Sequence, residues 1–111
     1  MTDKIVVFTT CASVEDARRI AAHLVDVRLA ACVAINPGLT SVYRWQGAVD
    51  EAQECGLTIK TRRDLFPLLA AEIRKLHTYE VPELIAVPIV DGLIPYLEWM
   101  DSSLLPPHQA S

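Results

Sequence analysis

Residues 31–61 read ACVAINPGLTSVYRWQGAVDEAQECGLTIKT and predict a long β-hairpin. The first strand runs from Ala31 to Trp45, and Gln46-Gly47 supplies a tight turn with glycine at the second central position. The chain returns from Ala48 to Thr61, where polar and apolar residues alternate. Pro37-Gly38 interrupts the first strand and predicts a bulge or an edge position, because proline cannot donate a ladder hydrogen bond.

The length of this hairpin predicts that it projects from its own domain. A strand from Ala31 to Trp45 reaches roughly 50 Å at the usual rise per residue. A globular chain of this size has a radius of gyration of about 13 Å. Open strand edges on a projecting hairpin are normally covered or paired, so we expect an oligomer joined through strands.

The flanking sequence completes a βαββαβ order. Ile5 to Thr10 is apolar on both faces, which is typical of a central strand covered on each side. Ser13 is expected to cap a helix over residues 14–27, and Asp64 is expected to cap a second helix with Pro67 in its first turn. That helix ends at His77.

The C-terminal third adds one strand and one helix. Leu84 to Val90 predicts a strand, and Pro88 places it at a sheet edge. A last helix is expected to start near Pro95, followed by a tail from residue 104 to residue 111. Two helices against a four-stranded antiparallel sheet indicate an α+β, ferredoxin-like fold with a protruding hairpin and a C-terminal helix.

Composition narrows the class of protein. A chain of 111 residues fits a single domain over residues 1–111. The formal net charge of −4 argues against nucleic-acid binding, and no apolar run is long enough for a membrane span. The three cysteines make no disulfide framework, and no export signal is recognisable, so we expect a cytoplasmic protein.

Motifs for the standard catalytic sites are absent, and no enzyme activity is expected. Cys11 follows the first strand, where a thiol is a metal-ligand candidate, although a half-buried structural role is the simpler interpretation. Cys32 and Cys55 lie in strand patterns and are expected in the core. His23 and His108 have no evident partner and are expected at the surface.

The densest grouping of polar and aromatic residues comes from three separate segments and predicts a small-ligand or metal site. Its members are Tyr43, Trp45, Lys60, His77, Tyr79 and Glu83. Simpler interpretations stay open: the aromatic pair fills an interface, Lys60 and Glu83 form an ion pair, or His77 favours the helix C-terminus. The nearby acidic residues Asp50, Glu51 and Glu54 are expected to form a solvated face.

Four motifs resemble the CutA divalent-cation tolerance family over roughly residues 4–103. They are RLAACV at 28–33, SVYRWQG at 41–47, IKT at 59–61 and HTYEVPEL at 77–84, and YLEW at 96–99 also matches. The resemblance implies a ferredoxin-like homotrimer, similar to the PII signalling proteins, with long hairpins packed into neighbouring subunits. It also implies a role in tolerance to divalent cations, notably copper.

The copper ligands that the resemblance implies are a cysteine at the end of the first strand and two adjacent histidines after the second helix. This chain has Thr9 and Leu76 at two of those positions, so only His77 is kept, with Cys11 nearby. One imidazole is a poor copper(II) site by ligand count. No cofactor is required, and any copper(II) binding is expected to be weak.

Two functions follow as hypotheses. The first is a non-enzymatic trimer in the response to metal ions, binding a cation or small ligand between subunits. In it, His77 is a ligand or hydrogen-bond donor, Glu83 is its carboxylate partner, and Lys60 faces any anion. The second is a PII-like sensor of a small anionic metabolite, suggested by Lys60, Arg62 and Arg63. A structural trimer with incidental metal affinity would have the same sequence features.

Overall fold

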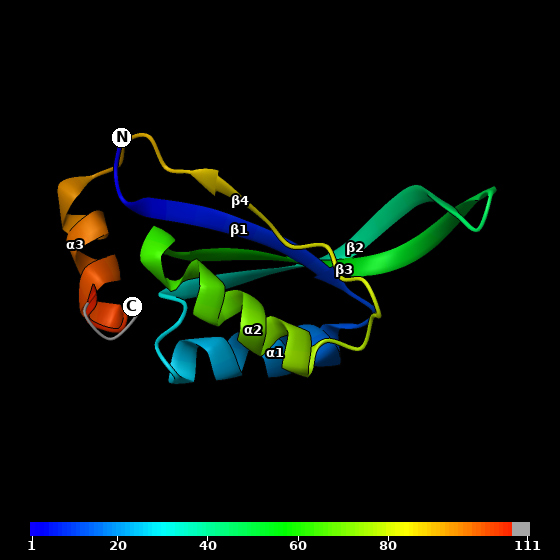
Figure 1. The fold of residues 1–111 in the computed structure, drawn as a ribbon, viewed down its shortest axis with the longest axis horizontal. Coiled ribbons are helices and arrows are strands. Elements are labelled where there is room, and N and C mark those ends of the chain that lie inside the picture. The colour runs from blue at the N-terminus through cyan, green and yellow to red at the C-terminus, as the bar shows by residue number, and fades with distance from the viewer. Residues whose placement is uncertain (108–111) are drawn as a thin grey trace.

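A four-stranded antiparallel sheet with strand order β2-β3-β1-β4 carries the fold in the computed structural model, which describes residues 1–107. The elements in chain order are β1 (Lys4–Cys11), α1 (Val14–Asp26), β2 (Cys32–Trp45), β3 (Ala48–Arg62), α2 (Phe66–Leu76), β4 (Ile85–Pro88) and α3 (Ile94–Ser103). Helices α1 and α2 cover one face of the sheet, and α3 lies at the end away from the hairpin tip (Figure 1). The predicted α+β, ferredoxin-like architecture is confirmed. None of the helices in residues 1–107 is long and apolar enough to cross a membrane.

The core lies between the sheet and the two helices. Paired residues of β1 and β3 share a face, and Val7 with Ile59 is fully buried there. Helix α1 contributes Ile20 and Leu24, which are also fully buried. On the opposite face of β1, Val6 and Phe8 are only half-buried. The expectation that this strand is covered on both faces is therefore wrong for the single chain.

The hairpin of β2 and β3 projects as predicted. The molecule measures 44 × 26 × 22 Å along its principal axes, and the hairpin extends beyond the body along the longest one (Figure 1). Gln46 and Gly47 have φ values of 50° and 82°, which matches a type I′ turn. The register shifts between Asn36 and Leu39, so the bulge predicted at Pro37-Gly38 is confirmed on an edge strand.

Of the two predicted helix N-caps, one is confirmed and the other is wrong. Ser13 caps α1 by accepting a hydrogen bond from the Asp16 backbone N–H at 3.1 Å. Asp64 does not cap α2, whose N-cap residue is Leu65 without a side-chain bond. Asp64 lies instead in a short 3-10 turn, Arg63–Leu65, where its carboxylate pairs with Arg62. The Asp64 side chain, which was expected to cap the helix, is engaged in the ion pair with Arg62.

The C-terminal region differs from the prediction at its strand and its tail. Strand β4 spans only Ile85–Pro88, at the sheet edge that Pro88 predicted. Helix α3 starts at Ile94, as expected from Pro95. Leu104 is not part of a free tail, because it is 4% exposed and belongs to the core. The next residue, Leu105, donates its backbone N–H to the Arg28 carbonyl at 3.1 Å.

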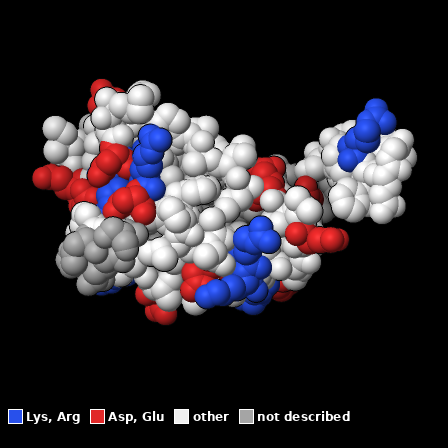
Figure 2. All heavy atoms as spheres, in the orientation of Figure 1, with Lys and Arg blue, Asp and Glu red and all other residues white. Residues whose placement is uncertain are grey.

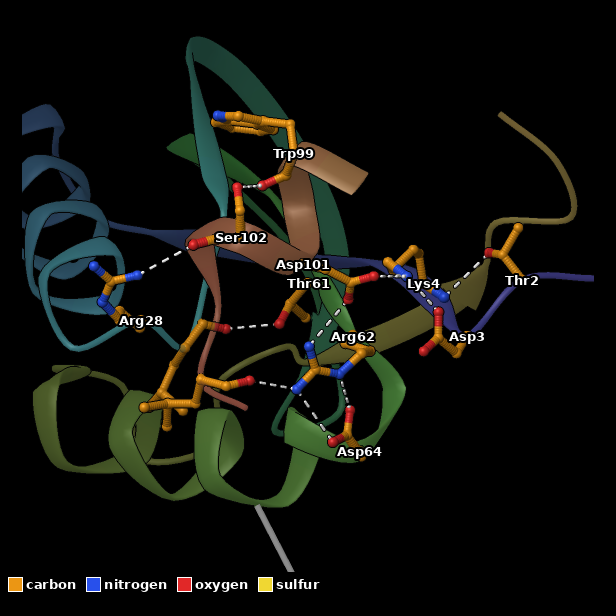
Figure 3. Close-up of polar contacts among 12 residues, drawn as sticks. Thr2, Asp3, Lys4, Arg28, Thr61, Arg62, Asp64, Trp99, Asp101 and Ser102 are labelled. Carbon is orange, nitrogen blue, oxygen red and sulfur yellow. Dashed lines mark hydrogen bonds and ion pairs between the residues drawn. The ribbon is translucent and has the colours of Figure 1, made fainter. Parts of the chain in front are cut away.

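A buried guanidinium fastens this C-terminal region to the sheet (Figure 3). Arg62 is 2% exposed, and its guanidinium donates to Asp64 at 2.6 Å, to Asp101 at 3.2 Å and to the Leu105 carbonyl at 2.6 Å. Lys4 pairs with Asp3 and with the second oxygen of Asp101. Burial lowers the pKa of Arg62, but its bonds to the two carboxylates outweigh this and raise it above the ordinary value.

Replacing Arg62 tests how far α3 depends on this cluster. We expect Arg62→Met to lower the free energy of unfolding by about 2–4 kcal/mol, because one change removes several charge-assisted hydrogen bonds from a buried site. Hydrogen exchange should accelerate most in α3. The exposed neighbour gives the control, Arg63→Met, which should change stability by less than about 0.5 kcal/mol. Equal effects of the two variants in denaturant titrations would contradict this assignment.

Candidate functional site

A cavity of about 990 Å³ opens in the angle between the hairpin and the connection from α2 to β4. We call it the hairpin pocket. The hairpin supplies Tyr43, Trp45, Asp50 and Glu54 among its walls, and the connection supplies residues 78–83. Four residues of the predicted ligand site, Tyr43, Trp45, Tyr79 and Glu83, therefore lie together. Tyr43 and Trp45 both line the pocket, as expected of two residues on one face of a strand. Other lining residues are Thr10, Ser41, Val42 and Ala52.

The polar centre of the pocket is a carboxylate–phenol pair. The Tyr79 hydroxyl donates to Glu54 Oε2 at 2.7 Å and joins the α2–β4 connection to β3. Burial raises the pKa of Glu54, but hydrogen bonds from the Ser41, Tyr79 and Thr10 side chains, with nearby His77, lower it below the ordinary value. Burial raises the pKa of Tyr79, and the hydrogen bond to the Glu54 carboxylate raises it further. At neutral pH the pair is an ionised carboxylate and a neutral phenol.

Both ring nitrogens of His77 are occupied by the backbone. Nε2 lies 2.6 Å from the Thr10 carbonyl, and Nδ1 accepts the Tyr79 backbone N–H at 3.0 Å. Since a carbonyl only accepts and an amide N–H only donates, the neutral tautomer with hydrogen on Nε2 fits both contacts. This histidine therefore fastens the α2–β4 connection to β1. Its expected carboxylate partner, Glu83, is not among these contacts.

Cys11 is more buried than expected. It is the last residue of β1 and 1% exposed, so the interpretation as a half-buried loop thiol is wrong. Burial raises the pKa of this thiol to about 11, and its Sγ contacts the Ser13 carbonyl at 3.4 Å. A thiol that stays protonated at neutral pH is a poor metal ligand. Within residues 1–107, no group of three or more His, Cys, Asp or Glu side chains is arranged to hold a metal ion.

The basic residues that the sequence suggested for an anion site do not line the hairpin pocket. Lys60 lies opposite Cys32 in the sheet, and its ammonium is 5.7 Å from the centre of the Tyr96 ring rather than paired with Glu83. Arg62 is committed to the buried cluster described above. No lysine or arginine contributes to the pocket lining within the described part of the chain. The three cations that suggested an anion site are thus not gathered in this pocket.

Other residues differ from their predicted surroundings. Asp50 and Glu51 are exposed and fit the expected solvated face, whereas Glu54 is half-buried and lines the pocket together with Asp50. Cys55 is in the core, whereas Cys32 is only half-buried on an edge strand. His23 Nε2 lies 3.6 Å from Glu72, a partner on α2 that the sequence did not suggest. His108 falls outside the described residues.

Removing the Tyr79 hydroxyl tests the carboxylate–phenol pair. At pH 7 we expect Tyr79→Phe to lower the free energy of unfolding by about 1–2 kcal/mol, since a hydrogen bond to a charged acceptor is lost. The folded-state pKa of Glu54 is lowered, so its ionised form stabilises the fold above the unfolded value of 4.5. That contribution disappears as pH falls through the lower folded value, and the gap between the two proteins should narrow there.

The matched control for this pH series is Tyr96→Phe. Tyr96 lies on α3, at the end of the molecule away from the hairpin tip, and does not line the pocket; its hydroxyl makes no hydrogen bond among the described residues. Denaturant titrations at several pH values should give a small, pH-independent difference for this variant. A Tyr79→Phe gap that stays constant down to pH 3 would show that ionised Glu54 is not the acceptor that matters.

Comparison with known proteins places the chain in a family. The sequence model of a protein family, described as "CutA1 divalent ion tolerance protein", matches residues 5–103. The divalent-cation tolerance protein CutA of Thermus thermophilus is 54% identical over 95 residues, 86% of this chain and 92% of that protein. Human Protein CutA is 44% identical over 93 residues, 84% of this chain but 52% of the human protein. The chain thus spans about half the length of that relative.

Solved structures agree in fold. The Thermus thermophilus structure, a "Divalent cation tolerance protein (Cut A1)", has a TM-score of 0.89 at 50% identity, covering 91% of this chain and 98% of that one. The CutA structure from Xylella fastidiosa has a TM-score of 0.91 at 40% identity, covering 93% and 99%. The motifs quoted from residues 28 to 99 all lie inside the matched region. The chain therefore belongs to the CutA divalent-cation tolerance family.

Proposed function

We propose that the chain works as a non-enzymatic, cytoplasmic homotrimer in the response to divalent cations, with clefts between subunits as its ligand sites. Family membership supports the link to divalent cations, since that is the role that the relatives' names state. The observation that carries the assembly is the hairpin, which extends beyond the body with apolar side chains uncovered. The trimeric number rests on the family resemblance. All three cysteines are free thiols, which suits a reducing compartment.

Uncovered apolar residues support strand-mediated association. On the hairpin, Val42 and Val49 are 64% and 67% exposed. On and after β4, Ile85 and Val90 are 55% and 66% exposed, and no further strand covers the outer edge of β4 in residues 1–107. Open edges and apolar patches of this kind are typical of surfaces that pair with another chain. The half-buried face of β1 offers a further area for a neighbour.

The contacts of His77 and Cys11, the two candidate copper ligands, support weak binding of copper(II). His77 has no free lone pair, because Nε2 bears hydrogen and Nδ1 accepts the Tyr79 amide. Cys11 is buried and protonated. Soft and imidazole ligands are the ones that give copper its high affinity in proteins, so their engagement here leaves weaker oxygen donors. We infer that His77 is a positioning residue that shapes the pocket.

Solution mass tests the assembly. We expect the purified protein to have about three times the chain mass of 12.3 kDa by light scattering after gel filtration. Val87→Arg should shift the mass towards one chain, since it places a charge on the exposed edge strand. Val25→Arg is the control, because Val25 on α1 is equally exposed, at 43% against 42% for Val87. A wild-type protein with the mass of one chain would overturn the trimer.

Copper titration against a competing chelator tests the metal site. We expect a dissociation constant weaker than about 1 μM, unchanged within about twofold in His77→Ala. The variant itself should be less stable, because two backbone hydrogen bonds are lost. His23→Ala, which removes a half-exposed imidazole, controls for adventitious binding. Tight binding that disappears only in His77→Ala would instead make His77 a metal ligand.

A further inference from the structure

We propose that Cys11 and Cys55 form a reversible disulfide bond between strands β1 and β3 when the protein is exposed to a peroxide. We call these two residues the cysteine pair. The modification goes beyond the proposed response to metal ions. It does not depend on the trimer either, because both residues belong to the core between the sheet and the helices of one chain (Figure 1).

The two cysteines face each other on neighbouring strands. Cys11 lies directly opposite Cys55 in the antiparallel register of β1 and β3, so both side chains are on the same face of the sheet. The Cα atoms of such opposite residues are about 4.5–5.5 Å apart, within the range of about 4.4–6.8 Å that a disulfide spans. The Cys11 Sγ lies 3.6 Å from the Cys55 carbonyl oxygen. Opposite Cβ atoms, at about 4.5–5.5 Å, are slightly further apart than in most disulfides, and a bond that draws two strands together is easier to reduce.

The cysteine pair lies where the hairpin leaves the body. It is the last pair in the register of β1 with β3, and among residues 1–107 the rest of β3, residues 48–54, has only β2 beside it. The neighbouring residues hold the α2–β4 connection, since the Thr10 carbonyl contacts His77 and Glu54 accepts a hydrogen bond from the Tyr79 hydroxyl. A disulfide bond here fastens the base of the hairpin to β1. The pair is thus placed to restrict movement of the hairpin base when an oxidant is present.

Burial keeps the cysteine pair reduced in the resting protein. Cys11 and Cys55 are 1% and 2% exposed, and burial raises the pKa of the Cys11 thiol to about 11. The thiolate is the reactive form, so the reaction has to wait for local opening at the end of β1, next to the exposed residue Ala12. Figure 2 shows acidic side chains at the surface where the hairpin leaves the body, and these repel anionic oxidants such as oxidised glutathione. Hydrogen peroxide is small and uncharged, which makes a peroxide the expected oxidant.

The oxidation is a two-electron reaction in which the peroxide is reduced. The Cys11 thiolate attacks one oxygen of hydrogen peroxide, the O–O bond breaks, and Cys11 becomes a sulfenic acid. The other oxygen leaves as hydroxide, which takes up the proton that the thiol released. Cys55 then attacks the Cys11 sulfur, the S–S bond forms, and the sulfenic oxygen leaves as water. Two thiols lose two electrons and two protons, and one hydrogen peroxide becomes two molecules of water.

Thiol mapping after peroxide treatment tests the proposal. Reduced protein is treated with hydrogen peroxide under native conditions, alkylated in denaturant, and mapped by peptide mass spectrometry. We expect one alkylated thiol, Cys32, and a cross-link between Cys11 and Cys55 that dithiothreitol reverses. A non-reducing gel should show that the cross-link lies within one chain. Hydrogen exchange at the Thr10 and Cys11 amides should slow at least about threefold in the oxidised protein, because the bond restricts opening of the strand end.

The matched variants are Cys32→Ser and Cys55→Ser. Cys32 lies opposite Lys60, five residues along β3 from Cys55 and thus about 16 Å away, so Cys32→Ser should form the same cross-link. Cys55→Ser should form no cross-link, and peroxide should leave its exchange rates unchanged; Cys55→Ala takes its place if circular dichroism shows that serine prevents folding. Three alkylated thiols in the wild-type protein, a cross-link that includes Cys32, or a Cys11 sulfinic acid without a cross-link would overturn the site. None of these results bears on the mass and copper tests of the proposed function.

Discussion

Alternation along strand β3 is the constraint on which the rest of the molecule depends. One set of its side chains, including Leu57 and Ile59, is buried against the two helices. The same strand then continues beyond the body as half of the hairpin. A shift of one residue in its pairing with β1 would turn the apolar set outward. The buried core, the projecting arm and one wall of the hairpin pocket are thus set by a single register.

The pocket exists because the connection between α2 and β4 is fastened in place. This segment has no regular secondary structure of its own through residues 77–84. His77 bonds to the backbone of β1, and Tyr79 bonds to Glu54 of β3. These contacts satisfy polar groups that would otherwise be buried without partners, which is the usual requirement for an irregular segment packed on a sheet. A histidine that looks like a metal ligand in sequence is used here to shape a cavity.

Local pattern was sufficient for most of the fold. The hairpin, its turn at Gln46-Gly47, the bulge and the Ser13 cap each depend on neighbouring residues, and all were predictable. The failures involve side-chain contacts that depend on the folded structure rather than on a local pattern. Asp64 was expected to cap a helix, and it pairs with Arg62 beside Asp101 from the far end of the chain. Leu104 was expected in a free tail, and it closes the core.

The same distinction explains the candidate site. Tyr43 and Trp45 were placed together correctly because strand periodicity puts them on one face. Glu54 was missed because only the fold brings Tyr79 to it, 25 residues away in sequence. Lys60 was grouped with the pocket because its strand is shared, yet it lies at the other end of that strand beside Tyr96. Whether two residues of a long strand meet in one site depends on their position along the strand as well as on the face they share. The sequence pattern predicts only the face.

The position of β1 has a consequence for synthesis on the ribosome. Although it is made first, it pairs on one side with β3 and on the other with β4, where Ile5 lies opposite Pro88. The local hairpin of β2 and β3 needs only residues 32–62, whereas the second edge of β1 stays open until β4 (Ile85–Pro88) has emerged. Nascent chains therefore carry an apolar strand with an unpaired edge until β4 has been made, which is when premature association between neighbouring polypeptides is a hazard.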